Sequence, residues 1–230
     1  MNGTAIVTGG TGGLGTAVVE TLIGSGWHVV APWVAEKELE RLPEREGLTL
    51  VHADLLEPGE VAGVVAAATA EGPSPLRSVV NLVGGFAAGG RVHETSVEDF
   101  EHQFTLNLRP TYLVTAAALP HLLEAGGGAV VCVSTRAALR PFSGAAGYIS
   151  SKAAVLGFVR ALDAEYRNDR IRANAILPSV IDTPGNRASQ PDADYSKWVA
   201  PAEIASVIRF LCSGDSSPTS GAEIPVYGRA

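Results

Sequence analysis

The alternation of short apolar runs with helical patterns constrains the fold of this chain more than any other feature. The apolar runs are Ala5–Val7, Trp27–Ala31, Leu48–His52, Ser78–Val83, Ala129–Val133, Arg172–Leu177 and Ala222–Val226. Nearly continuous apolar strands that are joined by helical crossovers form parallel sheets covered on both faces. We predict an α/β fold: a single-domain Rossmann-type doubly wound parallel sheet of about seven strands, with helices on both faces.

The helical patterns between these runs agree with a single domain that spans residues 1–230. The first pattern ends near Ile23, and the later ones cover Pro58–Ala70, Ser96–Glu124, Tyr148–Tyr166 and Pro201–Leu211. A breaker at Gly72–Pro75 is too short to link two domains. The segment from Pro178 to Trp198 is rich in Pro, Ser, Asp and Asn, and we predict a substrate lid at residues 182–200.

Charge and composition exclude several classes of partner. The net charge of −7 is spread along the chain without a basic block, which argues against nucleic acid and against anionic membrane surfaces. No apolar run reaches membrane length and no secretory signal pattern opens the chain, so we expect a cytoplasmic protein. Cys132 and Cys212 lie in apolar patterns, which predicts buried free thiols. Arginine far outnumbers lysine, a composition typical of GC-rich bacterial genomes.

The first strand runs directly into the glycine-rich segment Thr8–Gly15, and a helical pattern follows at once. A strand, a glycine turn and a helix N-terminus together form an anion site, because unpaired backbone N–H groups and the helix dipole can meet a pyrophosphate. The sequence therefore predicts a nucleotide cofactor at this turn. Its candidate binding residues are Gly9, Thr11, Gly12, Gly13, Leu14 and Gly15.

The end of the second strand leaves the choice between NAD(H) and NADP(H) open. An acidic residue here would hold the ribose of NAD, and a basic residue would accept the 2′-phosphate of NADP. Pro32 and Trp33 provide neither charge, and Glu36 and Lys37 come slightly late. Trp33 can stack on the adenine ring, which is the same in both cofactors, and this contact does not distinguish their riboses. We therefore expect weak discrimination between NADH and NADPH.

Small or polar residues follow each predicted strand at the same edge of the sheet. They are Thr8–Gly15, Asp54, Gly84–Gly85, Ser134–Thr135 and Pro178. Right-handed crossovers place the carboxyl ends of parallel strands along one edge, where ligands bind at the point of reversed strand order. This placement indicates a dinucleotide-dependent enzyme.

Tyr148 and Lys152 stand four residues apart in a helical pattern, so their side chains share one face. A free tyrosine has a pKa of about 10, and a nearby ammonium lowers it by favouring the phenolate. A hydroxyl from Ser134 or Thr135 reaches the same place from the preceding strand end. The arrangement predicts a general acid or base.

With these residues in place, the chain resembles the short-chain dehydrogenase/reductase family over essentially its whole length. The family motif Thr-Gly-x-x-x-Gly-x-Gly matches at Thr8, Gly9, Gly13 and Gly15, and Tyr-x-x-x-Lys matches at Tyr148 and Lys152. The resemblance implies NAD(P)H as cofactor and catalytic roles for Asn107, Thr135, Tyr148 and Lys152. It also implies contacts to the cofactor from Asp54, Leu55, Asn81, Gly84, Tyr148, Lys152, Pro178, Ile181 and Thr183.

The resemblance assigns particular tasks to these residues. Asp54 and Leu55 would flank the adenine, and Asn107 would hold a water that relays protons. Lys152 would bind the hydroxyls of the nicotinamide ribose and lower the pKa of Tyr148. Pro178, Ile181 and Thr183 would close over the carboxamide.

Three places depart from the family pattern. Thr135 stands where the family has a catalytic serine, and Ser179 stands where a glycine usually follows Pro178. The family's Asn-Asn-Ala-Gly is Asn81-Leu82-Val83-Gly84 in this chain. The segments Val83–Gly90 and Leu177–Trp198 resemble quinonoid dihydropteridine reductases, which also lack the usual serine. Two features differ from that branch: Trp33 stands where it has an acidic residue, and Asn107 is not part of its pattern.

Three classes of function follow from these patterns. The first is an NAD(P)H-dependent reductase that acts on a carbonyl or quinonoid ring of a flat aromatic small molecule, bounded by Phe86, Tyr195 and Trp198. The second is an aromatic polyketide tailoring enzyme, either a ketoreductase or a monooxygenase. The third is a catalytically silent NAD(P)-binding sensor, against which the intact Tyr148/Lys152 pair argues. Helices that are apolar on more than one face predict a homo-oligomer. The family resemblance implies a homodimer or homotetramer.

Overall fold

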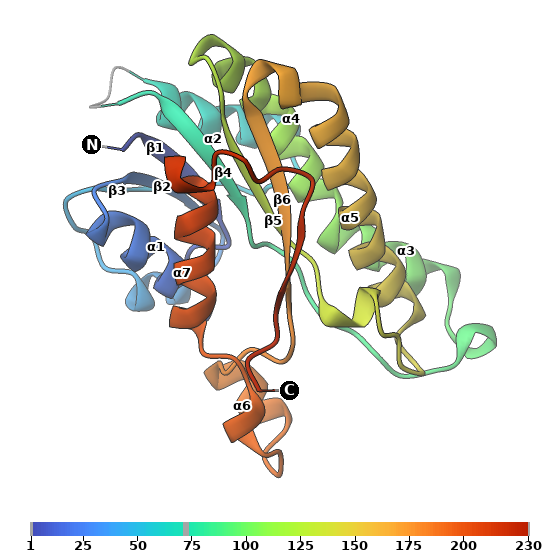
Figure 1. Cartoon of the computed structure of the whole chain (residues 1–230). Helices are drawn as coiled ribbons and strands as arrows, with labels where there is room; N and C mark the ends of the chain where they lie inside the picture. The colour runs from blue at the N-terminus through green and yellow to red at the C-terminus, as the bar shows by residue number, and fades with distance from the viewer. Residues whose placement is uncertain (1, 71–73, 230) are drawn as a thin grey trace.

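The computed structural model describes residues 2–70 and 74–229 and contains one parallel sheet of seven strands in the order β3-β2-β1-β4-β5-β6-β7 (Figure 1). The strands are β1 (Thr4–Thr8), β2 (His28–Trp33), β3 (Leu48–His52), β4 (Leu76–Asn81), β5 (Gly128–Val133), β6 (Ile171–Pro178) and β7 (Glu223–Val226). The predicted fold class, a single-domain doubly wound parallel sheet, is confirmed.

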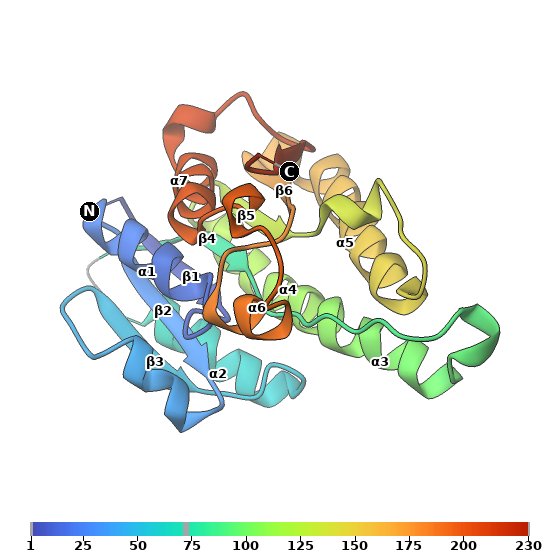
Figure 2. The same ribbon diagram turned by 90° about the horizontal axis from the view of Figure 1, so that it is seen from below.

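Helices cover both faces of the sheet, as Figures 1 and 2 show from two directions. The helices are α1 (Gly15–Gly24), α2 (Pro58–Thr69), α3 (Val97–Asn107), α4 (Arg109–Glu124), α5 (Ala146–Tyr166), α6 (Pro184–Ser189) and α7 (Pro201–Cys212). One apolar core lies between the sheet and α2, α4 and α5, and a second lies between the sheet and α1 and α7. The strands contribute to both cores, which explains their nearly continuous apolar sequences.

The reversal of strand order falls beside β1. This strand pairs with β2 on one side and with β4 on the other, both in parallel. Strands β2 and β3 therefore lie on one side of β1 and strands β4 to β7 on the other. In open α/β sheets the ligand crevice lies at the carboxyl ends of the strands beside this reversal, here β1 and β4. Thr8 and Asn81 are the last residues of these two strands and face each other in register.

The prediction of one long helix over Ser96–Glu124 is wrong, because the structure has two helices, α3 and α4, which are separated at Leu108. Pro110 explains the break: proline has no N–H for the helical ladder and favours the first turn of a new helix. The break places Asn107 at the last residue of α3. Pro120 lies inside α4, so a proline within a helical pattern does not by itself show that the helix ends there.

Two further segments differ from the sequence analysis. Strand β2 continues through Pro32 and Trp33, which pair with Val51 and His52 of β3 instead of ending the strand. The segment after Pro178, expected to be irregular, contains the short helix α6 and a 3₁₀ turn at Tyr195–Lys197. Other 3₁₀ turns cover Glu36–Arg41, Val92–Glu94, Arg136–Ala138, Arg167–Asp169 and Gly214–Ser216.

Cys132 and Cys212 are buried free thiols, as predicted. Within residues 2–70 and 74–229 no helix is long and apolar enough to cross a membrane. The breaker predicted at Gly72–Pro75 lies partly outside the described residues.

Candidate active site

The glycine turn between β1 and α1 is closely packed backbone. Gly9 has a φ of 65°, and its carbonyl oxygen accepts a hydrogen bond from the Gly12 N–H at 3.0 Å. A Cβ atom at Gly15 would lie 2.0 Å from that oxygen, so only glycine fits there. Helix α1 begins without a side-chain cap and without an acidic residue in its first turn. The helix N-terminus is therefore suited to an anion.

The turn is also joined to the neighbouring strand exit. The hydroxyl oxygen of Thr8 accepts hydrogen bonds from the N–H groups of Leu82 at 3.0 Å and Val83 at 3.3 Å. These bonds fix the segment after β4 against the end of β1. The crevice thus has a rigid floor at the point where strand order reverses.

Thr135 and Tyr148 are brought together across this crevice from β5 and α5. The Thr135 hydroxyl oxygen accepts a hydrogen bond from the Ala137 N–H at 3.3 Å. Its proton is then free to be donated, and the nearby Thr135 hydroxyl lowers the pKa of Tyr148 by favouring the phenolate. Burial acts in the opposite direction and more strongly, so the pKa of Tyr148 is raised.

Lys152 lies one turn further along α5 and is buried. Its ammonium donates a hydrogen bond to the Val133 carbonyl at 3.0 Å. Burial lowers the pKa of Lys152 to about 8, because the surrounding apolar core disfavours the charged form. Lys152 is not among the groups that shift the pKa of Tyr148: burial of the phenol raises this pKa and Thr135 lowers it, so the expected effect of Lys152 is not seen in this structure.

Asn107 and Lys152 approach each other around Gly84. A Cβ atom at Gly84 would lie 2.6 Å from the side-chain oxygen of Asn107 and 2.9 Å from the Lys152 ammonium. The Asn107 oxygen accepts a hydrogen bond from the Gly85 N–H at 3.0 Å, and its amide donates to the Ser151 hydroxyl at 3.2 Å. The end of α3, the exit of β4 and the face of α5 are therefore locked together here.

Ser134, the other candidate hydroxyl, points elsewhere: it donates to the backbone carbonyl of Lys152 at 2.8 Å. The geometry therefore favours Thr135 as the hydroxyl beside Tyr148. Asn81 is also turned away from the crevice, because its amide donates to the Thr115 hydroxyl at 3.0 Å within the core. The side chain of Leu55 is buried in the core with residues of α2.

Asp54 and Trp33 stand at neighbouring strand exits. The Asp54 carboxylate accepts from the Leu56 N–H at 2.9 Å, and the Asp54 N–H donates to Glu60. The Trp33 ring meets the His52 ring edge-on, with centroids 4.8 Å apart.

Glu38 is a residue that the sequence analysis missed. Its carboxylate accepts a hydrogen bond from the Thr11 hydroxyl at 2.8 Å. Glu38 lies in the 3₁₀ turn after β2, and this turn brings a negative charge back to the glycine turn. The glutamates at positions 36, 38 and 40 were the signal in the sequence for an acidic residue near the cofactor, but they follow the end of the second strand by several residues.

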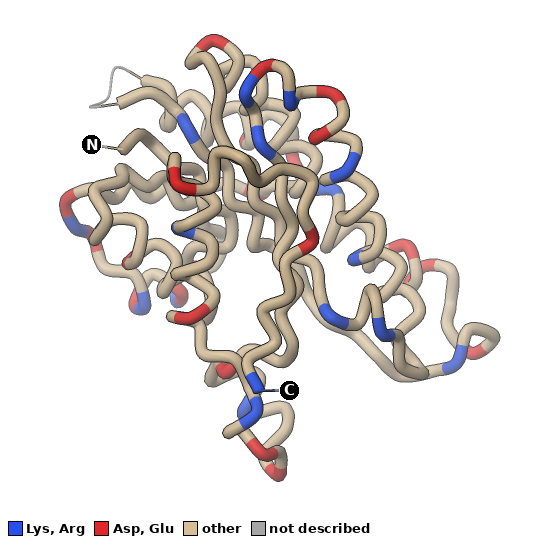
Figure 3. Tube along the Cα trace, in the orientation of Figure 1, with Lys and Arg blue, Asp and Glu red and all other residues tan. Residues whose placement is uncertain are grey.

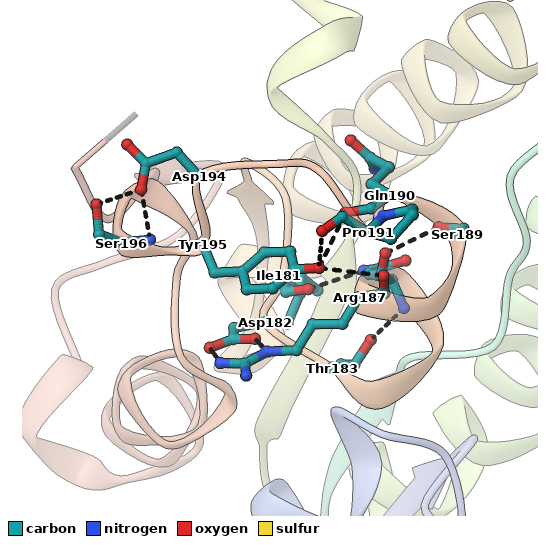
Figure 4. A network of polar contacts seen from close by, with 11 residues as sticks. Ile181, Asp182, Thr183, Arg187, Ser189, Gln190, Pro191, Asp194, Tyr195 and Ser196 are labelled. Atoms are coloured by element: carbon teal, nitrogen blue, oxygen red, sulfur yellow. Dashed lines mark hydrogen bonds and ion pairs between the residues drawn. The ribbon is translucent and has the colours of Figure 1, made fainter.

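The predicted lid is a compact substructure (Figure 4). Arg187 forms a bidentate ion pair with Asp182: its Nε lies 2.5 Å from Oδ1 and its Nη2 lies 2.7 Å from Oδ2. The Arg187 guanidinium also lies 4.7 Å from the Tyr195 ring centre. The Tyr195 hydroxyl donates to the Pro191 carbonyl at 2.9 Å, and its ring contacts the Trp198 ring. Figure 2 shows α6 lying across the carboxyl ends of the central strands.

The two ends of the lid meet at a bridge between Ile181 and Val199. The lid begins beside the glycine turn, because a Cβ atom at Gly13 would lie 3.0 Å from the Thr183 side chain. Pro178 is the buried last residue of β6, and the Ser179 hydroxyl donates to the Tyr227 carbonyl at 2.8 Å. The departure from glycine at Ser179 thus ties the lid base to the segment after β7.

Aromatic side chains border the Tyr148 phenol. The rings of Phe86 and Tyr148 meet edge-on with centroids 5.0 Å apart, and the Phe142 ring lies 6.4 Å from Phe86. Phe86 is 64% exposed and Phe142 is 49% exposed, although both are large apolar residues. The sequence analysis named Phe86 but missed Phe142, which lies in an unpatterned loop.

These features together define the site of a dinucleotide-dependent oxidoreductase. A bare helix N-terminus and glycines that admit no side chain suit a nucleotide cofactor. A buried tyrosine and lysine one turn apart supply proton-transfer groups at the same edge of the sheet.

Comparison with known proteins agrees with this class. Residues 3–194 match the family described as short chain dehydrogenase. The chain is 30% identical to the 2-(R)-hydroxypropyl-CoM dehydrogenase of Xanthobacter autotrophicus, over 99% of this chain and 98% of that protein. It is also 30% identical to the dehydrogenase/reductase SDR family member 4 of Oryctolagus cuniculus, over 100% of this chain and 94% of that protein.

Among solved structures, a short-chain type dehydrogenase/reductase from Mycobacterium ulcerans superimposes with a TM-score of 0.92 at 26% identity, over 100% of this chain and 90% of that one. The chain belongs to the short-chain dehydrogenase/reductase family. It is an NAD(P)-dependent oxidoreductase that acts on a small molecule.

Proposed function

We propose that this enzyme reduces a carbonyl or quinonoid ring of a flat aromatic small molecule, with NAD(P)H as hydride donor. The observation that carries the proposal is the pair formed by Thr135 and Tyr148. The Thr135 hydroxyl lies near enough to the phenol to lower its pKa, and the exposed Phe86 ring meets the Tyr148 ring edge-on. A proton donor and a flat apolar wall therefore border the same space.

Each residue of the site has a distinct role in this proposal. Tyr148 donates a proton to the substrate oxygen as the hydride arrives from the cofactor. Its raised pKa keeps the phenol protonated until the reaction. Thr135 orients the phenol, and Asn107 holds the exit of β4 against α5. Lys152 stands where it would bind the nicotinamide ribose.

The remaining cofactor contacts follow from the same geometry. The glycine turn from Gly9 to Gly15 would hold the pyrophosphate, Asp54 and Trp33 would border the adenosine, and Thr183 would approach the nicotinamide from the lid. Glu38 adds a carboxylate 2.8 Å from Thr11 on the adenosine side. Since a carboxylate repels a 2′-phosphate, we propose that the enzyme prefers NADH.

The aromatic border supports a planar substrate. Phe86 and Phe142 expose apolar rings beside Tyr148 that a flat ring system can cover by stacking. The related 2-(R)-hydroxypropyl-CoM dehydrogenase carries an aliphatic substrate in its name, so an alcohol of that type belongs in the test. The polyketide monooxygenase and sensor alternatives have no specific observation in their favour.

The test compares substrates with the purified enzyme. We expect NADH oxidation with quinonoid dihydropterin or a naphthoquinone, and little with acetoacetyl thioester or, in the oxidative direction with NAD⁺, 2-hydroxypropyl-CoM. Clear preference for either of the last two would contradict a flat-ring substrate while leaving the oxidoreductase class intact. Activity with none of them would favour the oxygenase or sensor alternatives.

We further propose that the enzyme is a cytoplasmic homodimer or homotetramer. On the outer faces of α4 and α5, the rings of Tyr112 and Phe158 lie 5.9 Å apart, and Tyr112 is 55% exposed. Such an apolar surface suits contact with a second copy. Light scattering at micromolar concentration tests this, and a monomer would contradict it.

A further inference from the structure

A cavity of about 500 Å³ lies at the amino-terminal end of β6, away from the candidate active site. Its walls come from the end of α5, the turn after it, the start of β6 and the loop before β7, and include Asp163, Arg167, Arg170, Arg172, Ser217 and Ser220. Strand β6 has 8 residues. At a rise of roughly 3.3 Å per residue, about 25 Å separate this cavity from the cofactor crevice.

The charges around the cavity are unequal, with three guanidinium groups against one carboxylate. Asp163 pairs with Arg167 one helical turn away. Arg170 has no hydrogen-bond or ion-pair partner for its side chain within residues 2–70 and 74–229. Figure 3 shows acidic positions interspersed with the basic ones where α5 meets β6, but Glu165 and Asp169 do not line the cavity.

Arg172 is only partly satisfied. One terminal nitrogen, Nη2, donates to the carbonyls of Leu211 at 2.9 Å and Ser213 at 3.1 Å, at the end of α7. The other, Nη1, is buried and has no partner. Oδ1 of Asp163, on the same wall, is also buried without a partner. The free Nη1 of the partly buried Arg172 is therefore an unmet hydrogen-bond donor that an adjacent anion can accept from.

The backbone at Arg170 is a second, independent feature of the cavity. Arg170 has a φ of 61° and a ψ of 23°, and it is the only residue other than glycine with a positive φ among the described residues. This conformation costs an arginine roughly 1 kcal/mol and costs glycine nothing. Strained residues of this kind gather at functional sites, where the side chain is needed despite the strain.

We propose that this cavity binds a small molecule that carries a multivalent oxyanion, such as a phosphate or a tricarboxylate. Arginine is suited to such groups because its planar guanidinium donates two parallel hydrogen bonds. The Ser217 and Ser220 hydroxyls add neutral polar groups at the wall. The volume falls within the range of small-molecule sites, roughly 300–1,000 Å³.

Thermal unfolding of the full chain tests the proposal, with saturating NAD⁺ present so that the glycine turn cannot take up the added anion. Pyrophosphate, inorganic phosphate and citrate are titrated separately against sodium chloride at equal ionic strength. We expect at least one of the three to raise the melting temperature in a saturable way below about 1 mM. Which anion does so distinguishes phosphate from carboxylate chemistry. Stabilisation equal to that by chloride would overturn the proposal.

Three variants locate the effect. Arg170→Gly removes the guanidinium and suits the left-handed backbone, so the unliganded protein should be no less stable than wild type. We expect this variant to bind the anion at least tenfold more weakly, while Arg170→Lys, which keeps a charge, stays within about fivefold. Arg91→Ala removes an exposed arginine elsewhere and should bind normally. Unchanged affinity in Arg170→Gly would refute the site.

Discussion

The tyrosine cluster and the lid meet at one crevice but are held in different ways. In the cluster around Thr135, Tyr148 and Lys152, hydrogen bonds join residues from different strands and helices, such as Lys152 to Val133 and Asn107 to Ser151. In the lid, the polar contacts of Arg187 and Tyr195 stay within residues 182–195. The cluster is part of the core, whereas these lid contacts are internal, so we predict that the lid moves as a unit about the bridge at Ile181 and Val199.

This difference predicts which measured quantity each region controls. Changes in the cluster should reduce turnover or alter the stability of the fold, because its groups are fixed by the sheet. Changes in the lid should alter substrate binding more than turnover, because its internal contacts do not extend to the core.

The largest expected effect is that of Tyr148→Phe. Removal of the phenol hydroxyl should lower turnover by roughly 10²- to 10⁴-fold, the usual contribution of a general acid. Cofactor affinity, measured by fluorescence titration with NADH, should stay close to wild type. Turnover near the wild-type value would exclude Tyr148 from the chemical step.

Thr135 tests the same cluster with a smaller change. Thr135→Val keeps the shape and deletes the donor, and we expect turnover to fall roughly 10- to 100-fold, the value of a hydrogen bond to a charged group. Thr135→Ser retains the hydroxyl and should be tolerated. The Ala137 N–H loses its hydrogen-bond acceptor in the valine variant. The free energy of unfolding of each variant is therefore measured in parallel, to separate a loss of stability from a loss of turnover. If valine and serine variants behave alike, no hydroxyl acts at this position.

The sequence predicted the parts of the fold and site that depend on local pattern. Strand order reversal, the glycine turn and the spacing of Tyr148 and Lys152 all follow from periodicity and residue type. The sequence could not show that burial raises the pKa of Tyr148, because burial depends on distant chain segments. For the same reason it missed Glu38, which reaches Thr11 across 27 positions, and Phe142, which no pattern marks.

A third prediction concerns Lys152 and pH. The folded pKa of about 8 lies below the ordinary value of 10.5, so between these values the unfolded chain binds one more proton than the folded protein. The free energy of unfolding should therefore rise with pH above about 8, by up to about 1.4 kcal/mol per pH unit. Burial raises the pKa of the Cys132 thiol to about 12, which acts in the opposite direction above pH 9.

Urea unfolding of wild type and Lys152→Met across pH 7 to 9 separates these contributions, because the thiols are the same in both proteins. The stability difference between them should change with pH in favour of wild type. Parallel pH profiles would show that the lysine is not titrating in this range.

Cofactor choice gives a smaller effect, again from a contact that joins distant segments. Glu38→Gln removes the charge and keeps a partner for Thr11, so we expect the preference for NADH over NADPH to fall about tenfold, or roughly 1.4 kcal/mol. Glu36→Gln is the matched control, because that carboxylate has no contact with the glycine turn. Equal ratios in wild type and both variants would restore the expectation of weak discrimination from the sequence alone.

The smallest expected effect comes from the lid, through Arg187→Met. This change removes the pair with Asp182 and the contact with the Tyr195 ring, but keeps an apolar stem of similar length. Exposed ion pairs contribute about 0.2–1 kcal/mol, so we expect KM to rise only two- to fivefold, with turnover and global stability unchanged. Asp182→Asn should match it, and the double variant should add little, since both break one contact. A fall in turnover as large as the rise in KM would show that the lid and the tyrosine cluster are coupled.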